Sequence, residues 1–301
     1  MLGLDAEILQ DSYNSWGPSA RDCLRFAKSP KVIGLHEQDV FRAASELTKD
    51  ASHFTAFQLP SATHRVFVVR PSPDSREIAS VEFGTNRLCD IFARAYARQG
   101  HAGRCSFYKT IREHPCFAPL AGQMFEIHLL LWLERCTDGT TLLCDDGVES
   151  SPVLKIQSCK GNQKFFYKAE ELKDISEPGK SICLVPTSRT FSTLDAVILT
   201  SDAVITVQIT IALKEDVIEQ EFDLIYRNLP SDLLAKRPDR YHVFITDNWV
   251  NAESLQEQDH TQIPNGTLVY STAISAESLD SKSPATEGRV DSLVKSRVSM
   301  Y

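Results

Sequence analysis

Four polar residues between positions 126 and 210 have the types and the order of a metal-dependent hydrolytic site. Glu126 lies in a helix-like apolar stretch, Asp195 lies at the end of a strand-like segment, and Gln208 and Thr210 are two residues apart on the next strand. Mg²⁺ in proteins takes oxygen ligands, and a bound ion can activate water against a phosphate ester. The pattern therefore predicts Glu126, Asp195 and Gln208 as ligands of Mg²⁺, and all four residues as candidate catalytic groups.

The last two of these residues weaken the prediction of catalysis. The nuclease cores that this pattern resembles usually carry an acid-x-Lys triplet, whereas this chain has Gln208-Ile-Thr210. A glutamine carbonyl can bind Mg²⁺ but brings no negative charge, and a threonine hydroxyl cannot replace a lysine cation beside the attacking water. Lys155, Lys160 and Lys214 are the cations whose positions could supply that charge, although such lysines are usually solvated.

A structural interpretation stands beside the catalytic one for each residue. Glu126 can be a boundary residue of its helix, with its carboxylate in water. Asp195 can bond the backbone of a loop, and Gln208 can satisfy a buried strand edge. Thr210 is a common strand residue and carries little information alone. The order and spacing of the four residues therefore indicate more than any one of them.

The segments around these residues predict an α/β sandwich with a mixed central sheet. A helix is expected to begin near Gly122, and a second helix is expected at 214–228. The runs at 194–199 and 204–213 are rich in β-branched residues, which suits strands buried on both faces. Further strands are expected at 141–144, 153–159, 165–167, 180–185 and 241–246. This order of elements is typical of a sheet covered by helices on its faces.

The remainder of the chain is expected to add a helical lead and a polar tail. Residues 1–55 read as helical, strands are expected at 64–70 and 77–83, and Thr85 or Asn86 is expected to cap a helix that reaches Ala97. From residue 252 the chain is rich in Ser, Glu, Asp and Thr, which predicts disorder. We therefore expect a helical segment at 1–55, an α/β domain with its lead-in at 56–251, and a disordered tail at 252–301.

Composition limits the classes of partner and compartment. The 301 residues carry a net charge of −8, which argues against a generic basic nucleic-acid binder and against strong binding to anionic membranes. The eight cysteines form no CxxC pair, which indicates reduced thiols. No signal peptide is visible, and no apolar run approaches the roughly 20 residues of a membrane helix. We therefore expect an intracellular protein, cytoplasmic or nuclear, with no membrane partner.

Several segments, taken in order, resemble one known class of proteins. They are Asn14–Arg21, with a Trp-Gly-x-x-x-Arg element, His64–Val68, Gly122–His128, Phe191–Ile198, Gln208–Thr210 and Tyr241–Ile245. Together they resemble the Crinkler and retrotransposon-hot-spot (RHS) class of eukaryotic effector-like proteins, in a fungal style. The resemblance covers about residues 14–246, which is most of the chain.

The resemblance implies a restriction-endonuclease-like fold of the PD-(D/E)XK type, often downstream of an NTPase. By position, Glu126, Asp195 and Gln208 would be the active-site polar groups, and Thr210 would occupy the slot of the usual lysine. Residues 1–55 would be the last helices of an NTPase module, so the chain would be a piece or a truncated copy of a longer protein. The chain itself has no GxxxxGK[ST] loop for a nucleotide phosphate.

Two functions follow from this resemblance and from the residues. The first is an effector-like interaction module that keeps a nuclease-type fold without catalysis, with a protein or a separate NTPase module as its partner. The alternative is a Mg²⁺-dependent nuclease that hydrolyses phosphodiester bonds of DNA or RNA. The neutral Gln208 and the missing lysine favour the first function, and the order of Glu126 and Asp195 favours the second.

Overall fold

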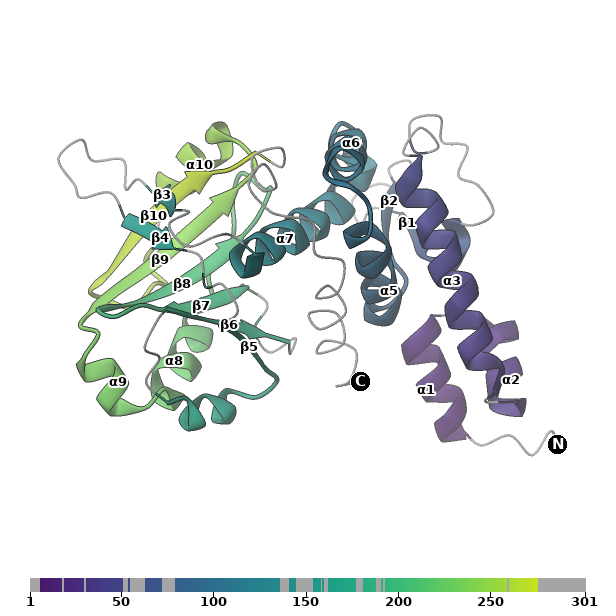
Figure 1. Ribbon diagram of the computed structural model, residues 1–301, viewed down its shortest axis with the longest axis horizontal. Helices are drawn as coiled ribbons and strands as arrows, with labels where there is room; N and C mark the ends of the chain where they lie inside the picture. Colours follow the sequence, from purple (N-terminus) through teal and green to yellow (C-terminus); the bar gives the residue numbers. More distant parts are fainter. Residues whose placement is uncertain are drawn as a thin grey trace. The chain divides into compact units, whose positions relative to one another are not determined.

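The computed structural model describes residues 6–275 apart from residues 18, 30, 51–53, 55–62, 72–78, 136–140, 145–153, 158, 160, 161, 177–180, 188–190, 192 and 259. The chain divides into two compact units (Figure 1), whose boundary falls between Met124 and Phe125. They are called here the N-terminal unit and the C-terminal unit, and each is described by itself.

The N-terminal unit consists mainly of helices. In chain order its elements are α1 (Ala6–Trp16), α2 (Ala20–Lys28), α3 (Lys31–Lys49), η1 (Thr63–Arg65), β1 (Phe67–Pro71), β2 (Ala79–Phe83), α5 (Asn86–Ala97), α6 (His101–Arg112) and η2 (Pro115–Phe117). The strands β1 and β2 form an antiparallel hairpin. The first three helices confirm the helical segment that the sequence predicts at the N-terminus.

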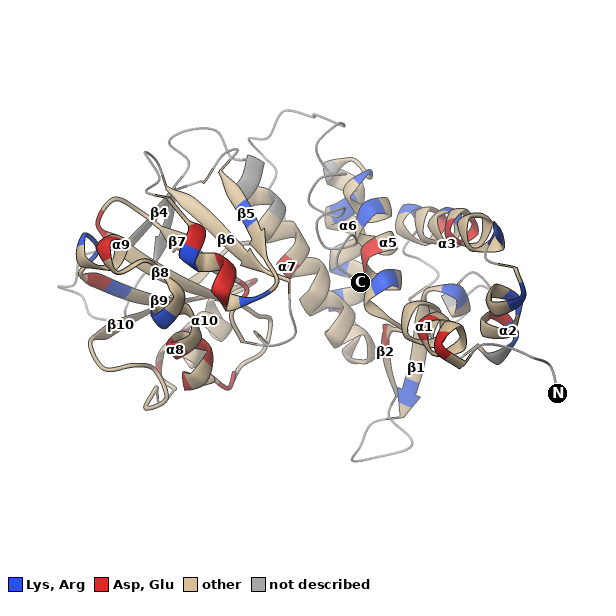
Figure 2. Ribbon diagram, turned by 90° about the horizontal axis from the view of Figure 1, so that it is seen from below, with Lys and Arg blue, Asp and Glu red and all other residues tan. Residues whose placement is uncertain are grey.

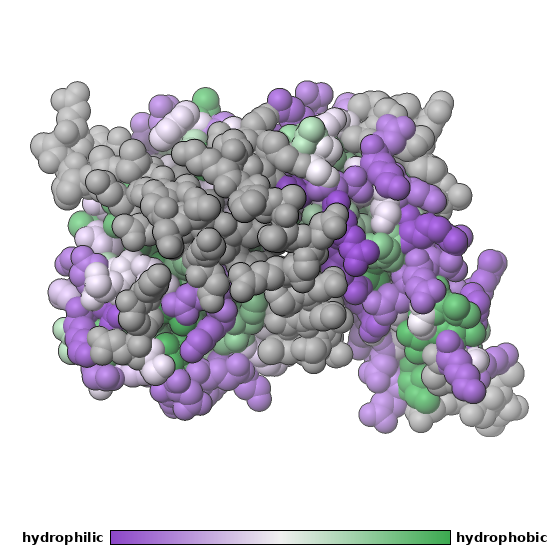
Figure 3. Space-filling model, viewed as in Figure 1, coloured by the Kyte–Doolittle hydropathy of each residue, from purple (hydrophilic) through white to green (hydrophobic). Residues whose placement is uncertain are grey.

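Aromatic side chains form the core of the N-terminal unit. The ring of Phe54 lies 5.4 Å from that of Phe107 and 5.1 Å from that of Phe117, and all three side chains are fully buried or nearly so. Apolar side chains also reach the surface of this unit: Figure 3 shows them gathered around α1 and α2, where Ile8 and Leu24 are exposed.

Thr85 caps α5, as one of the two sequence alternatives predicts. Its hydroxyl accepts a hydrogen bond from Leu88 N at 3.2 Å and donates one to Ser15 O at 2.7 Å, so it also ties α5 to the end of α1.

Replacing Thr85 with alanine is expected to lower the free energy of unfolding by about 1–2 kcal/mol, because it removes an N-cap acceptor and the bond to α1. Thr85→Ser keeps the hydroxyl and is the matched control. Urea unfolding followed by circular dichroism measures both variants, and an alanine variant as stable as the serine variant would contradict the role of the hydroxyl.

The C-terminal unit is built on a mixed sheet of six strands. The helix α7 (Ala118–Arg135) crosses the boundary between the units, and the hairpin of β3 (Thr141–Cys144) and β4 (Leu154–Gln157) follows it. The sheet has the order β10-β9-β8-β7-β6-β5. Its strands are β5 (Gln163–Phe166), β6 (Ile182–Pro186), β7 (Ala196–Leu199), β8 (Ala203–Ile209), β9 (Asp239–Thr246) and β10 (Thr267–Ala273). Only the pairs β6–β7 and β7–β8 are antiparallel among these neighbours.

One face of this sheet is covered by helix α8 and the segments around it. The remaining helical elements of the unit are η3 (Ala169–Asp174), α8 (Glu219–Asn228), α9 (Ser231–Ala235) and α10 (Trp249–Gln256). Val204 of β8 and Phe244 of β9 belong to the same buried cluster as Phe222 and Ile225 of α8. Figure 1 shows α8 and α9 on one side of the strands. This side is called the α8 face below.

The mixed α/β fold predicted from the sequence is confirmed, and several boundaries differ. The helix expected to begin near Gly122 begins at Ala118, and the strand expected at 204–213 ends at Ile209. The helix expected at 214–228 begins at Glu219, because the residues before it form a turn after β8. The sequence also places 252–301 in a disordered tail, but α10 continues to Gln256 and β10 occupies Thr267–Ala273. Composition did not predict β10 because it is an edge strand, which can include polar residues. Its Leu268 is exposed, whereas its Tyr270 is buried. Residues 276–301 lie outside the described residues.

No helix among the residues that the structure describes is both long enough and apolar enough to span a lipid bilayer.

Candidate functional site

The sheet brings three of the four predicted site residues together. Strand β7 runs antiparallel to β8, so the start of β7 lies beside the end of β8. Asp195 immediately precedes β7, and its backbone N–H donates to Val207 O at 2.9 Å. Its Oδ2 accepts a hydrogen bond from Ile209 N at 2.6 Å. The Asp195 carboxylate is therefore bound to the backbone between Gln208 and Thr210.

This bond gives Asp195 a structural task. The ladder of β7 and β8 ends at the pair Ala196 and Val207, and the carboxylate extends the pairing by one backbone N–H. A hydrogen bond from a backbone amide to an ionised carboxylate is among the stronger ones in proteins. One oxygen of Asp195 therefore holds β8 in place; the carboxylate binds backbone, as the structural interpretation predicts, but that of a strand and not of a loop.

Gln208 is buried on the α8 face. Residues two apart on a strand share a face, so Gln208 lies on the same side of β8 as Val204 and Thr206. It pairs with Phe244 of β9, and only 4 % of its surface is exposed. Its Oε1 is buried and has no hydrogen-bond partner in the described part of the chain. Gln208 is therefore enclosed in the core and is not presented to solvent as an open metal ligand.

Thr210 belongs to a network that holds the turn after β8. Its hydroxyl donates to Glu215 Oε1 and accepts from Ala212 N at 3.0 Å. Glu215 N donates in turn to Gln258 Oε1 at 3.1 Å, and Gln258 Nε2 donates back to Glu215 O. The slot of the usual lysine thus holds a hydroxyl with two local partners.

The helix that carries Glu126 approaches the sheet from the other side. It lies half-buried on α7, two turns before Leu133. Leu133 O accepts a hydrogen bond from Cys159 N, and the Cys159 thiol contacts Cys183. Ile182 and Leu184 belong to the buried cluster of the α8 face, so Cys183 between them points to the opposite face. The helix that carries Glu126 therefore ends on the face opposite to Gln208.

Neither the predicted lysines nor the acids of the described residues complete the predicted metal site near the end of β8. Lys214 is exposed, the side chain of Lys155 is not described, and Lys160 lies outside the described residues. Within the ranges that the structure describes, no three His, Cys, Asp or Glu side chains gather in a way that could hold a metal ion.

The sequence interpretation did not single out Glu221, which fixes the approach to Asp195. Its side chain is only 2 % exposed. Glu221 Oε2 accepts from Thr193 N at 3.1 Å, from Thr193 Oγ1 at 2.9 Å and from Leu194 N at 3.1 Å. The signal in the sequence was an acid beside Phe222 within the apolar stripe that also includes Ile225, because an acid in such a stripe must find donors.

His242 is a second buried polar residue that the sequence interpretation did not single out. It is fully buried in β9, and its Nδ1 lies 3.0 Å from Thr206 Oγ1. The Thr206 hydroxyl donates its only hydrogen to Tyr241 O, so it accepts from Nδ1–H of a neutral imidazole. Burial, together with the charge of His260, lowers the pKa of His242 to about 3.

No family model matches the chain, and neither the curated proteins nor the solved structures include a match. The proposal of a function therefore depends on these residues and their geometry.

Proposed function

We propose that this chain is a non-catalytic interaction module on a restriction-endonuclease-like sheet, in an effector-like protein of the Crinkler and RHS kind. The order of elements supports this fold: helix α7, the meander β6–β7–β8, the crossover helix α8 and the parallel strand β9. The hydrogen bond from Ile209 N to the Asp195 carboxylate is the observation that carries the loss of catalysis. Asp195, which would be the acid of a nuclease site, instead stabilises the sheet through this bond.

The distribution of charge also favours an interaction module over a nuclease. Residues 125–285, the C-terminal unit, contain 14 Lys and Arg against 25 Asp and Glu, whereas residues 1–124 contain 15 against 13. Figure 2 shows acidic segments on α8 and α9 of the C-terminal unit. An acidic unit repels the phosphate backbone that a nuclease must hold, because affinity for nucleic acid comes largely from Lys and Arg contacts to phosphates.

Exposed apolar side chains near the end of β8 offer a surface for a protein partner. Leu213 is 54 % exposed, and Trp249 and Val250 at the start of α10 are 58 % and 68 % exposed. Asn251 Nδ2 donates to Ile211 O and Ser254 Oγ donates to Leu213 O, so the turn after β8 and α10 form one surface. Contiguous exposed apolar groups of this kind commonly mark protein interfaces. The alternative protein partner that we propose for this surface is a separate NTPase module.

A nuclease assay tests the loss of catalysis. Purified protein and its Asp195→Ala variant are incubated with plasmid DNA, single-stranded DNA and RNA in Mg²⁺ or Mn²⁺. We expect no cleavage by the wild type beyond that of the variant. Metal-dependent cleavage that Asp195→Ala abolishes would refute the proposal and establish the nuclease alternative.

A capture experiment tests the interaction surface. Immobilised wild type and the double variant Trp249→Ser, Val250→Ser are exposed to an extract of the cells that express the protein. Tyr13→Ser is the matched control, because Tyr13 is 52 % exposed but lies on α1. We expect at least a tenfold loss of the captured protein for the double variant alone. Equal capture by all three proteins would place the interface elsewhere.

A further inference from the structure

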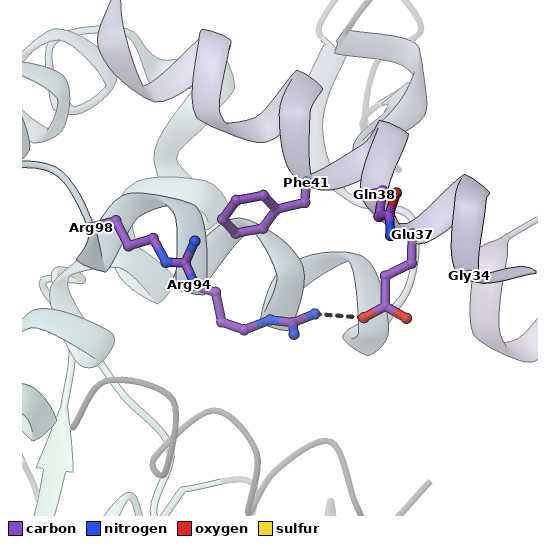
Figure 4. A pocket seen from close by; sticks show the side chains of 6 residues that line it. All are labelled: Gly34, Glu37, Gln38, Phe41, Arg94 and Arg98. Atoms are coloured by element: carbon purple, nitrogen blue, oxygen red, sulfur yellow. Dashed lines mark hydrogen bonds and ion pairs between the residues drawn. The ribbon is translucent and has the colours of Figure 1, made fainter. Parts of the chain in front are cut away.

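Helices α3 and α5 of the N-terminal unit leave a cavity of about 370 Å³ between them (Figure 4). Its lining residues are Gly34, Glu37, Gln38, Phe41, Arg94 and Arg98. The first four follow one another at helical spacing along one stripe of α3, and Arg94 of α5 is followed one turn later by the C-cap residue Arg98. The cavity is therefore a product of two regular helix faces and of the residues placed on them.

Gly34 is an exposed position at one end of this cavity. A Cβ atom added there would meet no atom within 4 Å, so a longer side chain could extend from it over the cavity.

The charged side chains that line the cavity are two arginines and one glutamate, so positive charge exceeds negative charge there. Arg87 and Arg94 each donate to one oxygen of Glu37 at 2.8 Å, so two guanidinium groups share one carboxylate. The side chain of Arg94 is 20 % exposed, and its Nε is buried with no hydrogen-bond partner among the described residues. Burial raises the pKa of Glu37, but the hydrogen bonds from Arg94 and Arg87 outweigh it, so the pKa is lowered and the anchor stays ionised.

Phe41 and Arg98 complete the cavity with an aromatic and a cationic group. The guanidinium carbon of Arg98 lies 4.8 Å from the centre of the Phe41 ring. Stacking on an aromatic ring orients the plane of a guanidinium group. Figure 4 shows the Arg94 and Arg98 side chains beside that of Phe41, with Arg94 extending to Glu37.

We propose that this cavity binds a small organic oxyanion, a phosphate or carboxylate group carried on a planar or apolar body. The guanidinium fork matches both oxyanions, and the volume lies in the range of small-molecule sites. The oxyanion lies against Arg94 and Arg98, and the body lies against Phe41 and the open end at Gly34. This site is independent of the proposed interaction module, because all of its residues belong to the N-terminal unit.

Calorimetric titration of the full chain tests the ligand class. Phenyl phosphate, benzoate and the neutral benzyl alcohol are the probes, and inorganic phosphate tests the contribution of the ring. We expect at least one of the two aromatic anions to bind at least tenfold more tightly than benzyl alcohol and inorganic phosphate, and to weaken in high salt. The stronger of the two identifies phosphate or carboxylate as the preferred group. The absence of saturable binding by both anions would overturn the proposal.

Two variants place the binding in this cavity. Arg94→Met removes the cation, with Arg42→Met as a control, because Arg42 is exposed on α3 and pairs with Asp39. Gly34→Met fills the open space without removing a charge and raises helix propensity, so it should fold at least as well as the wild type. Gly103→Met on the exposed side of α6 is its control. Affinity for the anion should fall at least tenfold in Arg94→Met and Gly34→Met only. Unchanged binding in Gly34→Met would overturn the assignment.

Discussion

Replacing Glu221 with alanine is expected to lower the free energy of unfolding of the C-terminal unit by about 3–4 kcal/mol, since each buried donor that loses its acceptor costs about 1–3 kcal/mol. The carboxylate accepts from two backbone N–H groups and one hydroxyl, of Thr193 and Leu194, and the chain offers these donors no other acceptor in the described contacts. A surface glutamate would show almost no such effect.

Urea unfolding at pH 7.5 measures the change for Glu221→Ala and for two companions. Glu221→Gln can keep the oxygen that accepts all three bonds but removes the charge, so a smaller loss of about 1 kcal/mol is expected. Glu219→Ala, an exposed acid on the same helix, is the control and should stay within about 0.5 kcal/mol of the wild type. Equal midpoints for Glu221→Ala and Glu219→Ala would contradict the proposed role of the buried carboxylate.

The same variant tests how Asp195 is positioned. Thr193 and Leu194 directly precede Asp195, so loosening them should release the bond from Ile209 N to the Asp195 carboxylate. Hydrogen exchange at the Ile209 amide should therefore accelerate in Glu221→Ala far more than exchange at Val243 in the centre of the neighbouring strand. Equal acceleration at both amides would indicate global unfolding only.

The strands that carry the site were predictable from composition alone. The β-branched runs around Val197 and Ile205 are buried on both faces, and such runs form central strands because no alternating polar face is needed. The cap at Thr85 was predictable for a similar reason: the signal is local in the sequence. Local patterns thus fixed where the elements lie.

The faces of the sheet were not predictable, and they bear on the proposed loss of catalysis. The order Glu126, Asp195, Gln208 says which residues follow one another, but not that α7 ends on the face opposite to Gln208. That depends on which of the two alternating sets of side chains on β8 meets α8. Both sets are buried, although only the set with Thr206 and Gln208 includes polar residues. The polar residues of β8 consequently looked like a site although they lie in the core.

His242 should make the stability of the C-terminal unit strongly dependent on pH below neutrality. Its imidazole is neutral and enclosed between the rings of Phe222 and Phe244, at 5.2 and 4.6 Å between ring centres. The buried Nε2 has no hydrogen-bond partner in the part of the chain that the structure describes, so a proton there would have no acceptor. The pKa in the folded state, about 3, therefore lies well below that of an exposed histidine.

A group with a lowered pKa in the folded state binds fewer protons there than in the unfolded chain, so stability rises with pH. The contribution of His242 is complete above about pH 6.5, the pKa of an unperturbed histidine, and it is lost as the pH falls from there toward 3. Between pH 7.5 and pH 5 the loss should be about 2 kcal/mol from this residue.

Urea unfolding of the wild type and of His242→Phe at pH 7.5 and pH 5 isolates this contribution. Phenylalanine fits among the neighbouring rings, and Thr206 keeps its bond to Tyr241 O, so the variant should fold. The stability lost between the two pH values should be smaller by about 2 kcal/mol in His242→Phe than in the wild type. His64→Phe, an exposed position, should lose as much as the wild type. If His242→Phe shows the same loss as the wild type, protonation of a buried His242 does not govern the acid sensitivity of this fold, and other groups must account for it.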